Sequence, residues 1–136
     1  MTYEFTVADV IPATPRAIYE AWLDSAGHTA MTGGEATASA ETGAAFTAWD
    51  GYIWGVNLAL DPFTRIVQSW RTTNFSESDP DSQIEVLLQP AAEGTRVELR
   101  HTNVPEDYRG YEDGGWQTNY FEPMKEYFAG KGTGAE

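Results

Sequence analysis

The chain has 136 residues, of which 41% are hydrophobic and 13% aromatic, so it fits one globular domain with a substantial core. It contains 21 acidic and 8 basic residues, and this net charge of −13 disfavours binding to nucleic acid or anionic lipid, because both are polyanions. The lack of cysteine excludes disulfides and thiolate sites, and no apolar run reaches the ~18–20 residues of a membrane-spanning helix. We therefore expect a cytoplasmic protein without membrane insertion.

The N-terminal part predicts a strand followed by two short helices. Tyr3–Ile11 alternates and is rich in β-forming residues. Thr14 then supplies an N-cap, and the proline that opens Pro15–Leu23 occupies the first helical position, where its missing N–H costs nothing. Ser25–Thr32 predicts another short helical turn.

Six further strands are predicted before the last helix, over Glu35–Ala40, Ala44–Trp49, Tyr52–Leu60, Arg65–Arg71, Ser82–Gln89 and Thr95–Asn103. Turn signals of hairpin length dominate the connections, so the sheet is expected to be antiparallel. In the third of these strands Trp54, Val56, Leu58 and Leu60 share one face, which we assign to the interior.

The stretch Gly115–Phe128 (GWQTNYFEPMKEYF) predicts a long C-terminal helix. At helical spacing Trp116, Tyr120 and Met124 fall on one apolar stripe. Pro123 lies inside this pattern and predicts a bend, because it cannot donate to the preceding turn. Such an aromatic helix needs a concave apolar surface, which the strands are expected to supply.

The order of these elements resembles the helix-grip fold of the START and Bet v 1-like (SRPBCC) superfamily. The sequence contains ADVIPATPRAIYEAWLD, RIVQSWR, and GTRVELRHTNVPED followed by GGWQTNYFEPMKEYF. These three stretches are similar to the Activator of Hsp90 ATPase homologue-like family within this superfamily. The resemblance implies an α+β domain over residues 1–129, with a curved antiparallel seven-stranded sheet wrapped around a long C-terminal helix, and a flexible tail over 130–136. Segment 28–50 departs most from the family pattern, because it is rich in small residues.

The resemblance implies two functions of different classes. Members of the superfamily bind lipids, hormones or polyketides, which implies a small apolar or amphipathic ligand between the sheet and the C-terminal helix. Domains of the family in eukaryotic co-chaperones dock onto Hsp90 and raise its ATPase activity, which implies a protein-interaction module. Such a module would use an exposed sheet face or the loop Pro105–Gly114. A monomer or weak dimer is expected in either case.

The predicted cavity wall combines apolar side chains with a few polar groups that would orient a ligand. Its members are Trp22, Phe46, Trp54, Val56, Leu58, Gln68, Trp70, Val86, Leu99, His101, Trp116, Tyr120 and Met124. His101 is expected to exchange a proton with the ligand, with Gln68 or Asn103 beside it. The alternative is a histidine whose hydrogen bonds are satisfied within the protein. For the aromatic side chains the alternative is that they fill the interior, since protein interiors are close-packed.

No catalytic, metal or cofactor site is predicted. His28 and His101 are the only histidines, and no His–Glu spacing or EF-hand pattern occurs. No serine or threonine is paired locally with a base, and no phosphate-binding glycine loop is present. The carboxylates fall on outward strand positions or in loops, with Asp9 and Glu122 the least certain. We expect a non-enzymatic protein, with a cyclase- or hydrolase-type enzyme as the third alternative.

Overall fold

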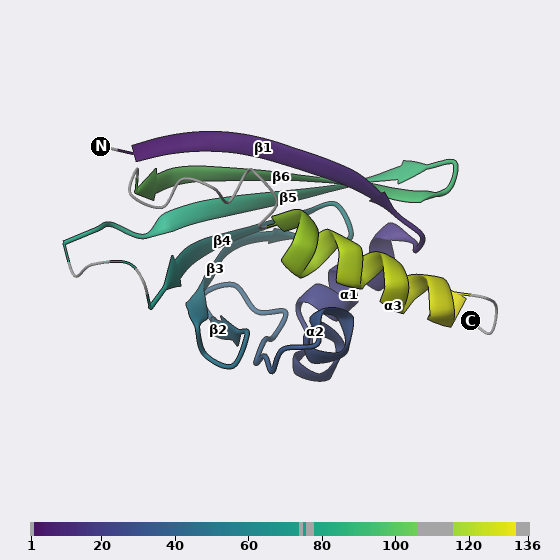
Figure 1. Ribbon diagram of the computed structural model, residues 1–136, viewed down its shortest axis with the longest axis horizontal. Coiled ribbons are helices and arrows are strands. Elements are labelled where there is room, and N and C mark those ends of the chain that lie inside the picture. Colours follow the sequence, from purple (N-terminus) through teal and green to yellow (C-terminus); the bar gives the residue numbers. More distant parts are fainter. Residues whose placement is uncertain (1, 74, 76–77, 106–115, 133–136) are drawn as a thin grey trace.

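The structure, a computed structural model, describes residues 2–73, 75, 78–105 and 116–132 (Figure 1). Its elements in chain order are β1 (Thr2–Ile11), α1 (Pro15–Trp22), α2 (Ser25–Thr32), β2 (Ala45–Ala48), β3 (Ile53–Asp61), β4 (Arg65–Thr72), β5 (Ser82–Ala91), β6 (Gly94–Pro105), η3 (Gln117–Phe121) and α3 (Glu122–Gly132). Within the described ranges no helix combines the length and the hydropathy that crossing a bilayer requires.

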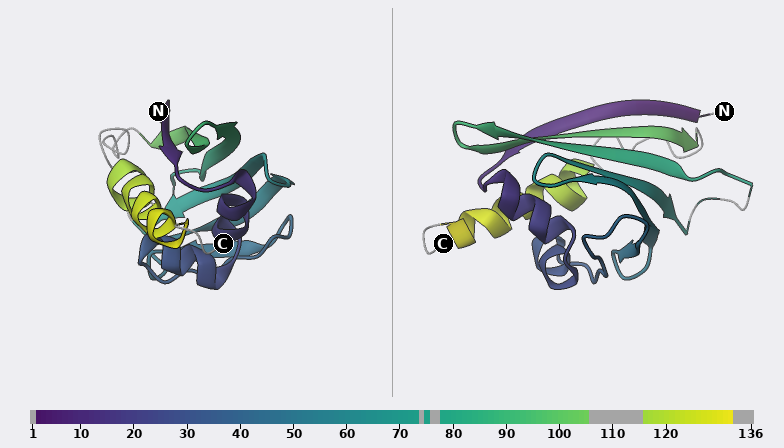
Figure 2. Two further views of the ribbon diagram at one scale, coloured as in Figure 1. Left: turned by 90° about the vertical axis from the view of Figure 1, so that its right-hand side faces the viewer. Right: turned by 180° about the vertical axis from the view of Figure 1, so that it is seen from behind.

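The six described strands form one antiparallel sheet in the order β1-β6-β5-β4-β3-β2. β2 to β6 follow one another across the sheet, whereas β1 lies at the far edge and pairs with β6, so that Val7 is opposite Leu99. The helices lie on the concave side of the curved sheet (Figure 2). The α+β class and the antiparallel, curved sheet are therefore as predicted.

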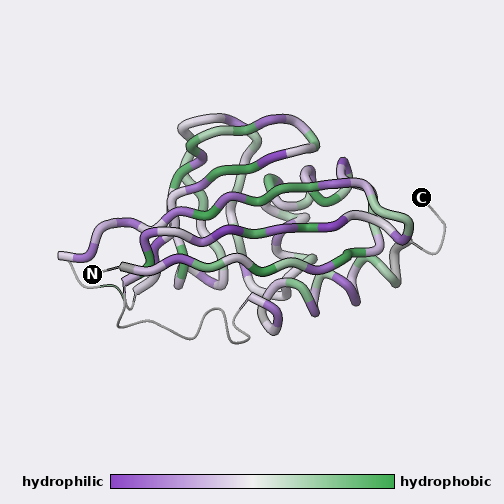
Figure 3. Tube along the Cα trace, turned by 90° about the horizontal axis from the view of Figure 1, so that it is seen from above, coloured by the Kyte–Doolittle hydropathy of each residue, from purple (hydrophilic) through white to green (hydrophobic). Residues whose placement is uncertain are grey.

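Along β5 and β6 the side chains alternate between a buried and an exposed face of the sheet. Val86, Leu99 and His101 are fully buried, whereas Gln83 and Arg100 on the opposite face are exposed. Figure 3 shows the same alternation of hydrophilic and hydrophobic residues along the strands. The inward face of these two strands forms the floor of the core.

Of the seven predicted strands, Glu35–Ala40 is not a strand in the structure. It makes a single β-bridge, in which Thr37 and Thr47 exchange backbone hydrogen bonds of 3.1 and 2.9 Å. The N–H groups of Ala36 and Ala38 point to the other edge of the segment, where they donate to Thr29 Oγ1 and Ser25 Oγ of α2, each at 2.9 Å. The segment is therefore held between α2 on one edge and β2 on the other.

The C-terminal helical segment changes its type along its length. It begins as the π-helix η3, whose last turn is closed by the Glu122 N–H donating to the Gln117 carbonyl oxygen five residues earlier. The following residue, Pro123, has no N–H to donate, and the wider turn precedes it directly. The single long helix that the sequence predicts is thus two consecutive elements. α3 also continues to Gly132, into the segment predicted as a flexible tail.

β3 is turned over relative to the prediction. Trp54 and Leu58 are 38% and 44% exposed, whereas Asn57 between them is buried. Trp54, Val56 and Leu58 of the face assigned to the interior therefore lie on the solvent side. A register shift between Asn57 and Ala59 then changes the alternation, so that Leu60 of the same predicted face does pack against the core.

Gly55 of β3 lies where two backbones approach closely. A Cβ at this position would lie 2.0 Å from the carbonyl oxygen of Ser69 on β4. We expect Gly55→Ala to lower the free energy of unfolding by about 1–3 kcal/mol, because the two strands must separate locally to admit the methyl group. Urea denaturation of both proteins measures the difference, and an unchanged midpoint would contradict this packing.

Candidate functional site

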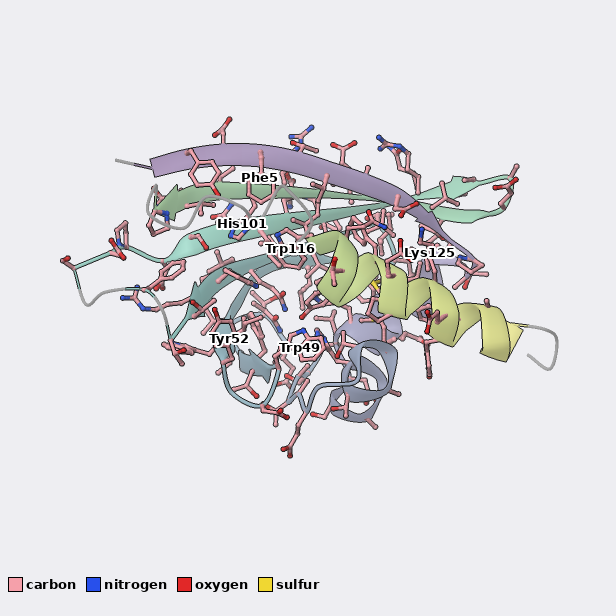
Figure 4. The ribbon with its side chains drawn as sticks, in the orientation of Figure 1. Phe5, Trp49, Tyr52, His101, Trp116 and Lys125 are labelled. Atoms are coloured by element: carbon pink, nitrogen blue, oxygen red, sulfur yellow. The ribbon has the colours of Figure 1, made fainter. Side chains whose placement is uncertain are left out.

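His101 lies at the centre of the concave face, where β6 meets the start of the C-terminal helical segment (Figure 4). The Trp116 indole N–H donates to His101 Nδ1 at 3.2 Å, so the neutral ring carries its proton on Nε2. Nε2 lies 2.9 Å from Ser82 Oγ, and the Ser82 hydroxyl donates to the Trp70 carbonyl oxygen at 2.6 Å. Both ring nitrogens of His101 are therefore bonded within the protein.

The surroundings of His101 are aromatic. Its ring centroid lies 4.7 Å from that of Trp70 and 5.4 Å from that of Phe5. Burial lowers the pKa of His101 to about 3, so the imidazole is neutral near pH 7. A proton exchange with a ligand near neutral pH is disfavoured by this pKa, and the contacts favour the alternative of a satisfied histidine.

The two residues expected beside His101 have other partners. Gln68 accepts the Trp22 indole N–H at 3.1 Å and donates to Asn57 Oδ1 at 2.9 Å. Asn103 is exposed and donates to the Asp81 carbonyl oxygen at 2.9 Å. Gln68 thus links α1 to β3 inside the core, and Asn103 lies outside it.

A second buried histidine, His28 of α2, was considered from the sequence only as a metal ligand. Its Nδ1 lies 2.8 Å from the Trp22 carbonyl oxygen and its Nε2 lies 2.8 Å from the Tyr120 hydroxyl. Nδ1 therefore carries the proton, and Nε2 accepts from Tyr120. Burial lowers the pKa of His28 and raises that of Tyr120, so both stay neutral. The spacing of His28, Met31 and Thr32, which are all buried, is the helical signal that identifies His28 as a core residue.

The aromatic residues predicted to line a cavity lie against one another. Ring centroids are 4.9 Å apart for Trp116 and Tyr120, 5.1 Å for Trp22 and Tyr120, and 5.5 Å for Trp70 and Trp116. At such separations the rings are in contact, so they fill the space between η3 and the sheet. Other predicted members that belong to the same buried cluster are Phe46, Val86, Leu99 and Met124.

Three predicted members do not belong to this cluster. Trp54 and Leu58 are exposed on the convex face, and Val56 between them is half-buried. The correction follows from the reversed orientation of β3, because alternation places all three residues on the side away from the helices. They cannot line a space between the sheet and the C-terminal segment.

Of the two carboxylates left uncertain by the sequence, Glu122 is the first residue of α3 and Asp9 lies beside that helix. Asp9 pairs with Lys125 at 2.8 Å and accepts from Gln117 at 2.9 Å, and Gln117 also donates to Glu122 at 2.7 Å. Partial burial alone would raise the pKa of Asp9, but its hydrogen bonds, including one from the Val10 N–H, together lower it. A general acid requires a raised pKa, so Asp9 acts here as a structural link between β1 and α3.

Two further features lie away from the aromatic cluster. A surface groove of about 610 Å³ runs between α1 and residues 38–40, and its lining includes Tyr19, Glu20 and Asp24. Trp49 lies in a left-handed turn conformation, with φ of 50°, and its buried indole Nε1 has no hydrogen-bond partner. None of the predicted cavity residues lines this groove.

The fold is a helix-grip α+β domain of the START and Bet v 1-like (SRPBCC) type. Its defining features are the curved antiparallel sheet, the pairing of the first strand with the last, the two short helices after β1, and the helical segment on the concave face. Comparison with known families then identifies the family within this fold type. The chain belongs to the family of Activator of Hsp90 ATPase homolog 1-like proteins, whose model matches residues 12–129.

Individual relatives agree with this assignment. The Activator of 90 kDa heat shock protein ATPase homolog of Dictyostelium discoideum is 30% identical over 117 residues, which cover 85% of this chain and 30% of that protein. The chain thus spans less than a third of the length of this relative. The crystal structure of an HSP90 activator from Plasmodium falciparum superposes with a TM-score of 0.79 at 20% identity, covering 93% of this chain and 96% of that one. CalU16 from Micromonospora echinospora superposes with a TM-score of 0.77 at 22% identity, covering 95% and 76%. At these identities the two structures establish the fold alone.

Proposed function

We propose that this chain is a protein-interaction domain that docks onto an Hsp90-type chaperone in the cytoplasm, as a monomer or weak dimer, and raises the chaperone's ATPase activity. The observation that carries the proposal is that the interior is filled and its polar groups are hydrogen-bonded. The polar groups of His101, His28, Tyr120 and Gln68 bond to other groups of the protein, and the aromatic rings around them are in contact. A filled interior leaves the surface as the place where a partner would bind. The partner is inferred from the family and from relatives that are described as Hsp90 activators.

The test is the ATPase rate of a purified Hsp90-type chaperone with and without the chain. The rate is expected to rise with chain concentration and to saturate, and binding measured by calorimetry is expected to saturate over the same range. An unrelated acidic protein of similar net charge is the control for non-specific effects of a polyanion. An unchanged rate together with no measurable binding would overturn the proposal.

A second candidate function is the binding of a small apolar or amphipathic ligand. It is favoured by one observation, the buried Trp49 indole N–H without a partner, because such a donor is an anchor for a carbonyl or carboxylate oxygen. A titration of the isotope-labelled chain with sterols, fatty acids and aromatic polyketides, followed by NMR, tests it. The Trp49 indole resonance is expected to shift first, and shifts at Trp70 and Trp116 would show that the ligand enters the core. If none of these compounds shifts a resonance, ligand binding is overturned and chaperone docking is the remaining proposal.

We also propose that the domain acts without catalysis of its own and without a cofactor. His101 has a pKa of about 3 and Asp9 has a lowered pKa, which removes both as acid or base candidates near pH 7. Incubation with ester and polyketide model substrates is expected to give no turnover. Turnover that is lost in His101→Gln would contradict this.

A further inference from the structure

Two side chains at the start of the C-terminal helical segment bond to buried histidines. The Trp116 indole N–H donates to His101 Nδ1 at 3.2 Å, and the Tyr120 hydroxyl lies 2.8 Å from His28 Nε2. The first contact joins the segment to β6, and the second joins it to α2. The two contacts differ in their response to protonation of the imidazole.

The geometry around His101 leaves Nδ1 as the one acceptor of the ring. Ser82 uses its only hydroxyl proton for the Trp70 carbonyl oxygen at 2.6 Å, so its oxygen accepts from His101 Nε2–H at 2.9 Å. An indole N–H can donate but cannot accept, so Nδ1 must be unprotonated in order to bind Trp116. A proton on Nδ1 would place two N–H groups against each other, and the hydrogen bond would be replaced by a repulsive contact.

The contact of His28 tolerates the same change. Its Nδ1 donates to the Trp22 carbonyl oxygen at 2.8 Å, and its Nε2 accepts from Tyr120. A tyrosine hydroxyl is both a donor and an acceptor, so it can turn its proton away and accept from a protonated Nε2. The Tyr120 contact therefore survives protonation of its histidine, whereas the Trp116 contact does not.

Among the residues that the structure describes, no charged side chain lies against His101 to offset a proton on the ring. Its neighbours on the elements packed against it are Phe5 of β1, Trp70 of β4, Ser82 of β5 and Trp116. None of these side chains titrates between about pH 5 and about pH 7.5. Burial among them lowers the pKa of His101 to about 3 from its ordinary value of 6.5. A form in which His101 reaches water is therefore favoured, relative to the closed form, as the pH falls below the ordinary value.

A further contact of the first turn of η3 does not depend on pH in this interval. Gln117 donates to Asp9 at 2.9 Å. Partial burial alone would raise the pKa of Asp9, but its hydrogen bonds together lower it, so Asp9 stays ionised down to about pH 5. Trp116 is 3% exposed and lies between Trp70 and Tyr120, so it is the side chain that holds this turn in the core.

We propose that the Trp116–His101 contact is an acid-sensitive attachment: when His101 takes up a proton, Trp116 and the first turn of η3 leave the sheet, while Tyr120 stays on His28. The opening exposes the part of the aromatic cluster around Trp70, so the interior that is filled at neutral pH becomes accessible at one end. This is a local event, distinct from unfolding of the whole chain, and it does not depend on chaperone docking. The population of the opened form is expected to rise about 30-fold between about pH 7.5 and about pH 5.

The first test compares two tryptophans of the unaltered chain. The Trp22 indole N–H donates to Gln68 Oε1 at 3.1 Å in the same core, so its acceptor is an amide that does not titrate. Hydrogen exchange of both indole protons is followed by NMR at the two pH values, in increasing low concentrations of urea, and corrected for the intrinsic exchange rate. Trp116 exchange is expected to be independent of urea, because a local opening exposes little surface, and to rise about 30-fold on acidification. Trp22 exchange is expected to rise steeply with urea, because it requires global unfolding.

Two outcomes of this experiment would overturn the proposal. If both indoles exchange at the same corrected rate and with the same urea dependence, Trp116 leaves the core only when the whole chain unfolds. If Trp116 opens locally at the same rate at both pH values, its opening is not linked to a proton on His101.

Two matched substitutions identify the histidine responsible. His101→Gln is expected to abolish the pH dependence of Trp116 opening, because an amide oxygen accepts from the indole without titrating. His28→Gln is expected to retain the rise of about 30-fold. A rise that persists in His101→Gln, or that disappears in His28→Gln, would overturn the assignment to His101. Should either variant fail to fold, the comparison of the two indoles in the unaltered chain decides.

Discussion

Replacement of Trp116 by alanine is expected to lower the free energy of unfolding by about 3–5 kcal/mol. Trp116 is 3% exposed and packs between Trp70 and Tyr120, so its removal leaves a large hole among rings that now touch it. The substitution also removes the donor to His101 Nδ1, and a buried acceptor without a donor adds to the cost. Urea denaturation followed by far-UV circular dichroism measures the loss.

The chain contains its own control for this experiment. Trp54→Ala deletes the same side chain, but at a position that is 38% exposed, and is expected to cost less than about 1 kcal/mol. A similar loss in both variants would contradict the placement of Trp116 in the core and of Trp54 on the convex face.

The second large effect is the loss of stability on acidification between about pH 7.5 and about pH 5. In the folded protein the pKa of His101 is lowered to about 3 by burial, whereas its ordinary value is 6.5. Below this ordinary value the unfolded chain therefore takes up a proton that the folded chain does not. The stability that the neutral imidazole provides is complete above the ordinary pKa and is lost as the pH falls toward the folded value. His101 alone is expected to remove about 2 kcal/mol by pH 5.

His28 acts in the same direction, because burial also lowers its pKa. Carboxylates titrate mainly below about pH 5, so the interval isolates the histidines. His101→Gln retains a neutral amide that can accept from Trp116, and its stability is expected to fall less steeply over this interval. A free energy of unfolding that is independent of pH between these limits would show that the buried histidines take up protons in the folded state.

Some of the fold follows from local sequence signals. The side chain of Thr14 accepts the Ala17 N–H, as the predicted N-cap requires, and α1 begins at Pro15. The predicted cavity-wall residues Val86, Leu99 and His101 do face inward, because β5 and β6 lie in the middle of the sheet, where one face is covered by helices and the other is open.

Other features depend on tertiary contacts that no local pattern contains. The apolar alternation of β3 identified which residues share a face, but not which side of the sheet that face occupies. The buried amide of Asn57 determines the side, because its partners come from Gln68 and from residues 39 and 41. The position of the expected strand Glu35–Ala40 likewise depends on Thr29 and Ser25 of α2.

For the candidate site, the sequence predicted which residues form the aromatic cluster, but it did not predict which hydrogen bonds they make. Trp22, Trp70, Trp116 and Tyr120 were predicted to be near one another, and they are in contact. That Trp116 donates to His101, and Tyr120 to His28, depends on how η3 lies on the sheet. The widened π-turns of η3, which rotate these side chains relative to an α-helix, are not encoded by hydrophobic periodicity.

The position of β1 has a consequence for how the protein is made. Thr2 at the start of β1 is opposite Pro105 at the end of β6, and β6 is the sheet neighbour of β1. During synthesis β1 precedes its partner β6 by all the other strands of the sheet, so it stays unpaired until nearly all of the sheet has been made. A pairing of such large sequence separation is slow, and a waiting strand with free backbone groups is a site for aggregation. The acidic residues Glu4 and Asp9 on β1 carry charge that opposes association between nascent chains.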